Sequence, residues 1–274
     1  MMLQPYLDRI EYGGAVDPNF TTLAALQEAH VFSVPFENLD VQLGRPLSVR
    51  IEDAYEKIVV NNRGGWCYEQ NGLFGWALSE IGFSVARIAA SVMREQRGEA
   101  STANHLCLLV RSPESKTKYL VDVGFGGSMI KPIEFKEGQY DQPPFKLGLT
   151  RLDGRYWRFW EDLGDGKFSF DFAEGPANES LIARKSASLQ SDPTSTFVLN
   201  LVAQRRSRGQ HRILRGRVFT VAKAGSMEST TVDSREALVS MLANEFRLDA
   251  PDVVRLWPRI VARHEELFGS NTSR

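Results

Sequence analysis

The sequence predicts an α+β fold in which a helical part comes first and a strand-rich part follows. Helix-type patterns with clear end signals occupy the chain up to about residue 83. Short β-type runs separated by turn signals then continue to about residue 190, and both types are mixed after that. Because the two types are segregated along the chain, the pattern favours α+β over a repeating βαβ array.

The helical part is expected to contain four helices. Gly13-Gly14 ends the first helix, and Gly82, in a left-handed cap position, ends the fourth. Thr21 or Thr22 is the expected N-cap of the second helix, which carries apolar residues near helical spacing. A connector that contains prolines, residues 34–49, separates the second helix from the third. The other expected helical ranges are 5–12, 51–60 and 67–81.

The strand-rich part is expected from runs of β-branched and aromatic residues. Asp153-Gly154 is a hairpin turn signal between the runs 145–152 and 155–162. In 167–174, strict alternation places Phe168, Phe170 and Phe172 on one face. Further strands are expected at 83–93, 105–112, 118–125 and 210–224, and two closing helices at 234–246 and 252–268.

Composition and charge narrow the class of function. The 274 residues suggest two compact domains plus a smaller part, and the net charge of −1 gives no electrostatic reason to expect nucleic acid or an anionic membrane. No apolar run approaches the ~20 residues of a membrane span, and the start does not resemble a signal peptide. Two cysteines without CxxC spacing indicate free thiols in a reducing, cytoplasmic setting. The basic run at 203–212 is interpreted as a solvated turn, with a phosphate contact as the alternative.

Cys67 stands where a reactive thiol would be presented. It follows Gly64-Gly65 and opens the expected fourth helix, so unpaired backbone N–H groups should converge on its side chain. A thiol is a strong nucleophile as a thiolate, which a helix N-terminus and a nearby imidazole both stabilise. The same N–H groups would stabilise an oxyanion on an acylated sulfur. Position alone leaves open that Cys67 is a buried, inert cysteine.

Of the four histidines, His105 is the candidate general base. It opens the run "HLCLLV", whose other members are apolar or thiol, and a strand end at the rim of a sheet suits this role. His30 and His264 are expected on helices as packed or solvated residues, and His211 on a turn among arginines. Cys107 shares a face with His105 and is interpreted as a small buried hydrophobic residue.

Asp122 is the candidate partner of His105. A turn at Pro113-Glu114 would pair Leu109 with Lys118, and in that register His105 lies opposite Asp122. A register shift by one pairing unit, that is by two residues, still leaves His105 and Asp122 on one face and near each other. A carboxylate inside such an apolar run needs a cationic or N–H partner if it is buried. We therefore hypothesise a set of nucleophile, base and orienting carboxylate, with a water-facing Asp122 as the alternative.

Four motifs together resemble the arylamine N-acetyltransferase family. They are "VPFENL" at 34–39, "RGGWC" at 63–67, the histidine that opens a strand, and "VDVGFG" at 121–126, in this order. The resemblance covers residues 1–130. Over the remainder it extends only through the length of the chain and the order of its helix-type and strand-type patterns. It implies a three-part fold with a core like that of cysteine proteases: an N-terminal helical bundle with the cysteine (1–83), a central β-barrel with the histidine and aspartate (84–190), and a C-terminal α/β lid (191–274).

The resemblance also implies the reaction. Cys67 attacks the thioester of the co-substrate acetyl-CoA, and the acetyl-cysteine then passes its acetyl group to a small aromatic amine or hydrazine in a ping-pong cycle. His105 moves protons in both halves, and Asp122 stabilises its charged form. No metal and no tightly bound cofactor is implied. A role in the metabolism of foreign amines is carried over as an expectation, and the oligomeric state stays open.

Binding residues are carried over from the resemblance one at a time. Phe36 and Phe125 match aromatic residues that wall the acceptor pocket, with ordinary core packing as the alternative. Gly126 and Gly127 match positions beside the pantetheine arm of CoA, where bare backbone allows a close approach. Thr102 and Asn104 match positions near the opening through which CoA passes. Arg63 and Glu37 are interpreted as an ion pair that links the connector to the turn before the cysteine.

The chain departs from the family pattern at one motif. In "SASLQSDPTSTF" it keeps Pro193, Ser195 and Phe197 but has Asp192 where a histidine is usual. This departure concerns the CoA contacts of the second half and not the three catalytic candidates. The alternative functions are a papain-like protease or transglutaminase, a relative that forms amides of large biosynthetic substrates, and a non-catalytic binding module.

Overall fold

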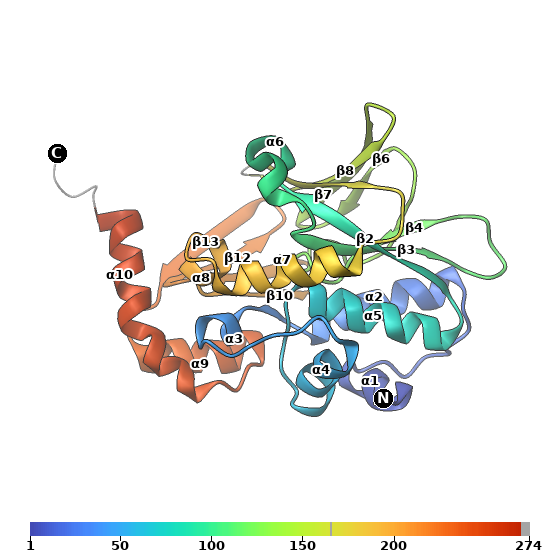
Figure 1. The fold of residues 1–274 in the computed structure, drawn as a ribbon. Helices are drawn as coiled ribbons and strands as arrows, with labels where there is room; N and C mark the ends of the chain where they lie inside the picture. Colours follow the sequence, from blue (N-terminus) through green and yellow to red (C-terminus); the bar gives the residue numbers. More distant parts are fainter. Residues whose placement is uncertain (165, 270–274) are drawn as a thin grey trace.

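The computed structural model describes residues 1–164 and 166–269 and confirms the α+β class (Figure 1). The expected N-terminal helices are present as α1 (Leu3–Arg9), α2 (Phe20–Ser33), α4 (Ile51–Tyr55), which runs into a π-helix (Glu56–Val60), and α5 (Cys67–Ile81). The predicted cap of α2 was wrong, because the side chain of Asn19 accepts the hydrogen bond from the backbone N–H of Thr22 at 3.0 Å. The connector holds a short strand, β1 (Phe36–Glu37), and a short helix, α3 (Leu39–Gln42).

Helix α5 begins and ends where its local signals predicted. Gly82 follows it with a φ of 106°, a conformation that residues with a side chain rarely adopt. Buried side chains of α5 such as Phe74 and Leu78 share an apolar cluster with α1 and α2. The helix also packs against strands β2 (Ser84–Val92) and β3 (His105–Arg111). The helical part therefore meets the strand-rich part along α5, the helix that carries Cys67.

The strand-rich part forms an eight-stranded antiparallel sheet with the order β5-β4-β3-β2-β9-β8-β7-β6. Its two edge strands are consecutive in the chain, and the Tyr140 hydroxyl of β6 donates to the Glu134 carbonyl of β5 at 3.1 Å, so the sheet curls into a barrel-like shape around a core rich in phenylalanine. A short helix, α6 (Arg94–Arg97), and a 3₁₀-helix (Gly98–Ser101) lie between β2 and β3. The remaining strands are β4 (Tyr119–Val121), β5 (Ile133–Glu134), β6 (Gly138–Gln142), β7 (Phe145–Leu152), β8 (Tyr156–Asp162) and β9 (Lys167–Ala173).

The register between β3 and β4 differs from the prediction by two residues. The turn forms as expected, since the Ser115 N–H donates to the Ser112 carbonyl. The next residues stay out of the ladder, and the Thr117 N–H is satisfied by the Ser115 hydroxyl. Leu109 consequently pairs with Leu120 and not with Lys118, and Asp122 lies just beyond the end of β4.

The C-terminal part forms a second sheet, and strand β1 of the connector is one of its edge strands. Its order is β1-β10-β11-β12-β13, and Phe36 of β1 pairs with Gln204 of β10. The expected paired strands and both closing helices are present, whereas α7 was not expected from the sequence. The elements are α7 (Glu179–Ser191), α8 (Thr196–Leu199), β10 (Val202–Ser207), β11 (Gln210–Arg215), β12 (Val218–Lys223), β13 (Ser226–Thr231), α9 (Arg235–Phe246), a 3₁₀-helix (Pro251–Leu256) and α10 (Trp257–Phe268).

The basic run at 203–212 is not simply a solvated turn. Arg208 at its tip is exposed, as expected. Arg206 is fully buried and donates to the backbone carbonyls of Gly127, Gln142 and Pro143. His211 lies on β11 and is buried, so its predicted place on a turn was also wrong. The alternation of strands β10 and β11 turns these two side chains toward the barrel.

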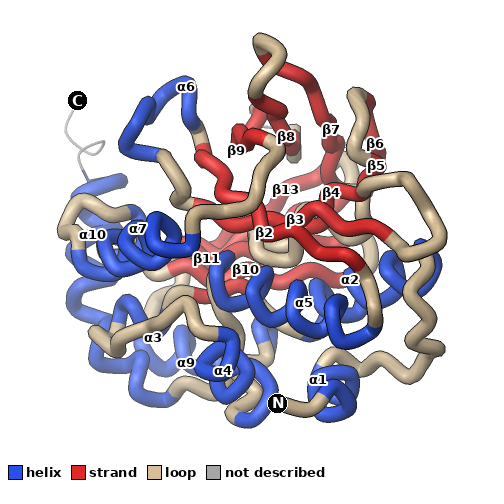
Figure 2. Tube along the Cα trace, turned by 45° about the vertical axis from the view of Figure 1, so that its right-hand side comes forward, coloured by secondary structure: helices blue, strands red, loops and turns tan. Residues whose placement is uncertain are grey.

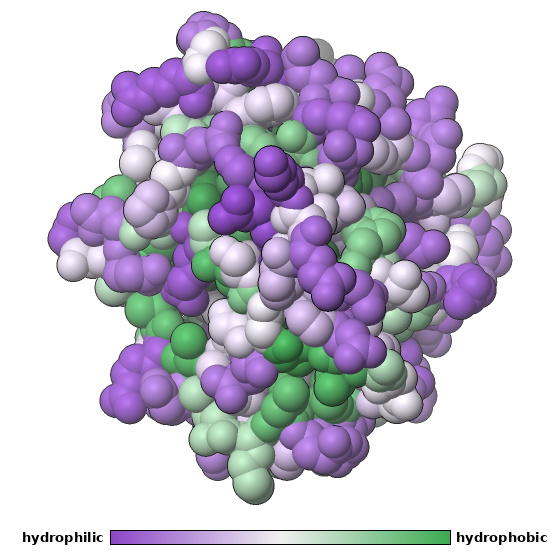
Figure 3. Space-filling model, turned by 90° about the vertical axis from the view of Figure 1, so that its right-hand side faces the viewer, coloured by the Kyte–Doolittle hydropathy of each residue, from purple (hydrophilic) through white to green (hydrophobic). Residues whose placement is uncertain are grey.

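The surface agrees with a molecule whose apolar side chains are mostly internal. Strands and helices occupy different regions of the molecule, with most helices below the strands in Figure 2. The face in Figure 3 is mostly hydrophilic, with hydrophobic side chains gathered in its lower half. Within residues 1–164 and 166–269, no helix combines the length and the apolar character that crossing a membrane requires.

Candidate active site

Local geometry presents Cys67 at the first residue of α5. A Cβ on Gly64 would lie 2.4 Å from the Pro35 carbonyl oxygen, so only glycine lets this turn pack against the connector. Glu69 caps the helix, because its Oε2 accepts the backbone N–H of Trp66 at 3.1 Å. Cys67 is buried and belongs to the first turn of α5, whose leading backbone N–H groups have no partner within a helix.

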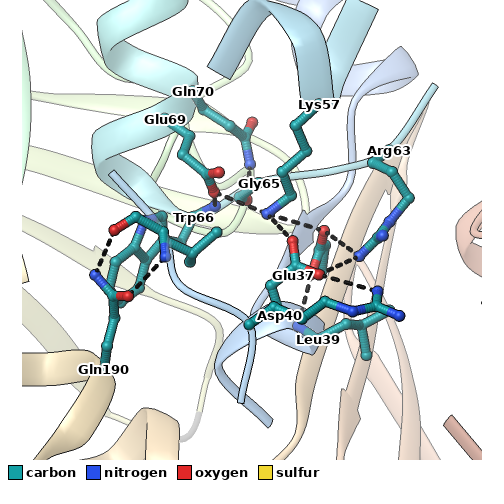
Figure 4. Close-up of polar contacts among 12 residues, drawn as sticks. Glu37, Leu39, Asp40, Lys57, Arg63, Gly65, Trp66, Glu69, Gln70 and Gln190 are labelled. Atoms are coloured by element: carbon teal, nitrogen blue, oxygen red, sulfur yellow. Dashed lines mark hydrogen bonds and ion pairs between the residues drawn. The ribbon is translucent and has the colours of Figure 1, made fainter. Parts of the chain in front are cut away.

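A buried cluster of charges supports this turn from below (Figure 4). Lys57 Nζ lies 3.4 Å from Glu37, 2.9 Å from Asp40 and 3.0 Å from Glu69. Arg63 Nη2 lies 3.4 Å from Glu37 and 3.2 Å from Asp40, which confirms the predicted Arg63–Glu37 pair. Burial alone lowers the pKa of Lys57, but the three carboxylates outweigh burial and raise it. The cluster ties the π-helix and the connector to the start of α5.

His105 and Asp122 are in direct contact despite the shifted register. Nε2 of His105 lies 2.6 Å from Oδ2 of Asp122, and both side chains are buried. The other oxygen of Asp122, Oδ1, accepts from Asn71 Nδ2 at 2.8 Å and from the Gly124 N–H at 2.8 Å. The carboxylate is thus fully hydrogen-bonded, and the water-facing alternative for Asp122 does not apply.

The third member of the set, Cys67, lies close enough to His105 for its sulfur to raise the pKa of the imidazole. Because Nε2 of His105 is taken by Asp122, Nδ1 is the nitrogen left for the sulfur. Burial lowers the pKa of His105, but the charge of Asp122, the hydrogen bond to it and the neighbouring Cys67 raise the pKa to about 10. The imidazole is therefore cationic at neutral pH and lies between the Asp122 carboxylate and the Cys67 sulfur.

Two residues that the sequence reasoning missed hold the two halves of the site together. Asn71 lies one turn after Cys67 on α5 and donates both to Asp122 and to the Leu106 carbonyl, while its own carbonyl oxygen accepts the Val123 N–H. Gly124 allows this close approach, since a Cβ there would lie 2.7 Å from both Cys67 Cα and Asn71 Nδ2. The signal available in the sequence was an asparagine four residues after the cysteine, which places it one turn further along the expected helix.

The predicted aromatic residues lie on two sides of the set. Phe125 is next to His105, with ring centroids 5.0 Å apart. Phe36 belongs to the apolar cluster that contains Cys67. The ring of Phe197, from the motif with the Asp192 departure, lies 6.2 Å from Phe36. Asp192 itself accepts hydrogen bonds from the backbone and hydroxyl of Thr194 within its own loop.

The predicted CoA-path residues fall into two places. Gly126 and Gly127 have φ of 74° and 91°, and a Cβ on Gly126 would lie 2.2 Å from Gln204 Oε1, so the loop after Phe125 needs glycine there. Thr102 lines a cavity of about 670 Å³ between the outer face of β2 and the loop that carries α6. Asn104 accepts the Val92 N–H at 2.7 Å and thereby shapes the loop that leads into His105.

The other histidines and Cys107 lie apart from the set. His30 is packed in the helical core beside Tyr6 and Gln70, as expected. His264 on α10 lies next to Phe268, with ring centroids 4.8 Å apart. Cys107 is buried in the barrel core, which agrees with its interpretation as a small hydrophobic residue. In the part of the chain that the structure describes, no group of histidine, cysteine and acidic side chains could hold a metal ion.

Comparisons with known proteins agree with this arrangement. A family model described as N-acetyltransferase matches residues 19–253. The arylamine N-acetyltransferase of Mycolicibacterium smegmatis is 34% identical over 260 residues, which cover 92% of this chain and 94% of that protein. The arylamine N-acetyltransferase of Mycobacterium marinum, solved in complex with CoA, aligns with a TM-score of 0.87 at 31% identity, over 97% of this chain and 99% of that one. The enzyme of Salmonella typhimurium aligns with a TM-score of 0.84 at 27% identity, over 95% and 98% of the two chains. The chain therefore belongs to the arylamine N-acetyltransferase family, whose members are acyltransferases.

Proposed function

We propose that the protein transfers acetyl groups from acetyl-CoA to aromatic amines and hydrazines through an acetyl-cysteine on Cys67. The observation that carries the proposal is that Cys67 lies beside the hydrogen-bonded pair of His105 and Asp122, although the three residues come from two separate parts of the fold. The CoA complex of the M. marinum relative supports CoA as the partner. A Cys-His-Asp set on this scaffold makes acyl transfer a better match than a non-catalytic binding module.

In the first half of the reaction, Cys67 attacks the carbonyl carbon of the thioester as a thiolate, its proton being held by the His105 imidazolium. The carbon–sulfur bond to CoA breaks as the new one forms, and the His105 imidazolium gives its proton to the departing CoA thiolate. The N–H groups at the start of α5 stabilise the oxyanion that forms in between. In the second half, the amine attacks the acetyl-cysteine, His105 takes the amine proton, and Cys67 leaves as thiolate. Asp122 holds the imidazole in the orientation that both steps need.

The binding roles follow the same proposal. Phe36 and Phe125 wall the site of the acceptor ring, and Gly126, Gly127, Thr102 and Asn104 lie along the path of CoA. We also propose the division into a helical bundle (1–83), a barrel (84–190) and a lid (191–274), of which residues 165 and 270–274 lie outside the described residues. The two free cysteines support a cytoplasmic location, and the family supports a role in the metabolism of foreign amines.

Mass spectrometry after incubation with acetyl-CoA alone tests the proposed function. We expect one acetyl group per chain, located on Cys67, and its loss when an aromatic amine or hydrazide is added. A protein that stays unmodified, or an adduct elsewhere in the chain, contradicts the proposal. If the adduct forms but no small amine or hydrazide removes it, the acceptor is a larger substrate of the biosynthetic type.

The charge of His105 can be measured directly. Nitrogen-15 NMR of the imidazole is expected to show a cation at pH 7.5, because the pKa of His105 is about 10. In Asp122→Asn the main group that raises the pKa is gone, and burial leaves the ring neutral at the same pH. His30 and His211, whose pKa burial lowers to about 3, should stay neutral in both proteins and act as internal controls.

The same shift sets the pH dependence of stability. A histidine whose pKa rises on folding from 6.5 to about 10 stabilises the fold fully below pH 6.5, and this contribution is lost as the pH rises toward 10. Chemical unfolding of the wild type should show this loss, and Asp122→Asn should show much less of it. If the Asp122→Asn variant keeps both a cationic His105 ring and most of its activity, Asp122 has only a structural role.

The close approach at Gly124 gives a further prediction. Gly124→Ala forces the Asp122 loop away from α5, because the new Cβ collides with Cys67 Cα and Asn71. Displacing catalytic groups by about 1 Å costs about 10²-fold in rate, so we expect a loss of this size in acetyl transfer. Gly13→Ala is the matched control, since a Cβ there meets nothing within 4 Å. Full activity of Gly124→Ala would mean that the two halves of the site do not need this contact.

A further inference from the structure

The inner face of the barrel carries a carboxylate beside the aromatic rings that border His105. Glu161 on β8 pairs with Phe168 on β9, and Phe159, two residues earlier on β8, is buried in the barrel core. Alternate residues of a strand face the same side, so Glu161 faces the side of Phe159. Phe168 stacks on Phe125 with ring centroids 5.2 Å apart, and Phe125 borders His105. Glu161 thus lies on the face whose rings lead to the proposed base.

Two polar atoms at this place lack a hydrogen-bond partner among the described residues. They are Oε2 of Glu161 and Oγ of Ser128, and both atoms are buried. The Ser128 hydroxyl is close enough to Glu161 to favour its charged form. A buried polar atom without a partner costs about 1–3 kcal/mol. A ligand that supplies hydrogen bonds at this point would recover that free energy.

The surrounding charges favour an uncharged ligand here. Burial raises the pKa of Glu161 to about 8, and the charge of Asp122 acts in the same direction. Ser128, His105 and Arg206 act against this rise. Glu161 is then mostly a neutral acid at pH 7, which both accepts and donates hydrogen bonds. The buried guanidinium of Arg206 is engaged with backbone carbonyls, and its charge disfavours a cationic ligand.

We propose that Glu161, together with Ser128, binds a hydroxyl or neutral amino substituent on the acceptor ring, at the end away from the amine that is acetylated. The inference rests on the proposed function, because it assigns a selectivity to the same site. A ring packed against Phe125 and Phe168 presents its amine to the acetyl-cysteine and its substituent to Glu161. A methyl group in the same place leaves both polar atoms unpaired, and sites built for a hydroxyl reject such analogues strongly.

The test compares 4-aminophenol with 4-methylaniline as acceptors and uses the ratio of their kcat/KM values. Comparing this ratio between variants cancels the difference in intrinsic reactivity of the two acceptors. In Glu161→Leu we expect the preference for 4-aminophenol to fall about tenfold, the size of one lost hydrogen bond. Glu161→Gln keeps an amide oxygen and an N–H group and should retain most of the preference.

Controls separate this inference from the proposed function. Asp141→Asn removes an exposed carboxylate from β6 of the same sheet and should leave the ratio unchanged. Formation of acetyl-Cys67 from acetyl-CoA should be equal in all variants, and its absence in the wild type would refute the proposed function itself. If acetyl-Cys67 forms and Glu161→Leu keeps the wild-type ratio, the inference is overturned while the function stands. Should Glu161→Leu not fold, Ser128→Ala decides: a lower ratio supports the inference and an unchanged ratio overturns it.

Discussion

Replacing Cys67 by alanine is expected to lower the rate of acetyl transfer about 10⁴-fold or more, as the loss of a covalent nucleophile does in related triads. His105 and Asp122 stay in place in this variant, but neither can carry the acetyl group between the two half-reactions. The fold should survive, because the cap of α5 uses Glu69 and the backbone of Trp66 and not the thiol. Release of CoA measures the activity, and the thermal unfolding midpoint measures the fold.

The second cysteine supplies the matched control. Cys107 is also buried, but burial raises the pKa of its thiol well above the usual value, so it stays protonated. Its side chain packs in the barrel core and is not needed for the chemistry. Cys107→Ala should therefore keep most of the activity and lose some stability through the small cavity it leaves. Transfer by Cys67→Ala at a rate near that of wild type would show that the sulfur does not carry the acetyl group.

The helix that presents the thiol was predictable because its signals are local. The glycine pair before Cys67 and Gly82 after Ile81 mark both ends of α5 within a few residues, and α5 has the bounds that they indicate. The cap of α2 shows the limit of such signals. Asn19, Thr21 and Thr22 are all good capping residues, and only the course of the chain before the helix decides between them.

The contact of His105 with Asp122 was predictable even though the register was not. The side chains of a strand alternate, so a register shift by two residues keeps each side chain on the same face of the sheet. The three residues between the turn at 112–115 and β4 stay outside the ladder, and no local pattern marks them as unpaired. The prediction of proximity therefore depended on alternation and not on the exact pairs.

Residues that act through distant partners were missed. Asn71 acquires its role only when the loop of residues 122–124 packs against α5, and Arg206 becomes buried only when β10 packs against the barrel. Lys57 looks like any lysine on an amphipathic helix until the connector and α5 place Glu37 and Glu69 around it. Such roles depend on long-range contacts, which periodicity and local signals do not encode.

Lys57→Met is expected to lower the free energy of unfolding by about 3–5 kcal/mol, the usual effect of breaking a buried ion pair from one side. Methionine fills nearly the same volume, so the loss comes from leaving the three carboxylates close together without their central cation. Arg63 still pairs with Glu37 and Asp40, and Arg45 still pairs with Asp40. Glu69, by contrast, has no other ion-pair partner among the described residues. Urea unfolding followed by circular dichroism measures the effect. Lys136→Met removes an exposed lysine that pairs with Glu134 and should leave the unfolding midpoint nearly unchanged.

The pH dependence of the stability deficit of Lys57→Met shows whether the charge or the packing of Lys57 causes the deficit. Without Lys57 the neighbouring carboxyl groups ionise less readily in the folded state, so their folded pKa values lie above the unfolded ones. Groups of this kind stabilise the fold at low pH and lose that contribution as the pH rises, so the deficit of Lys57→Met should shrink between pH 7 and pH 5. Glu69→Gln in the same background should recover part of the stability at pH 7, because it removes one of the unpaired charges. A deficit that is equal at both pH values would mean that Lys57 acts through the packing of its methylene chain and not through its charge.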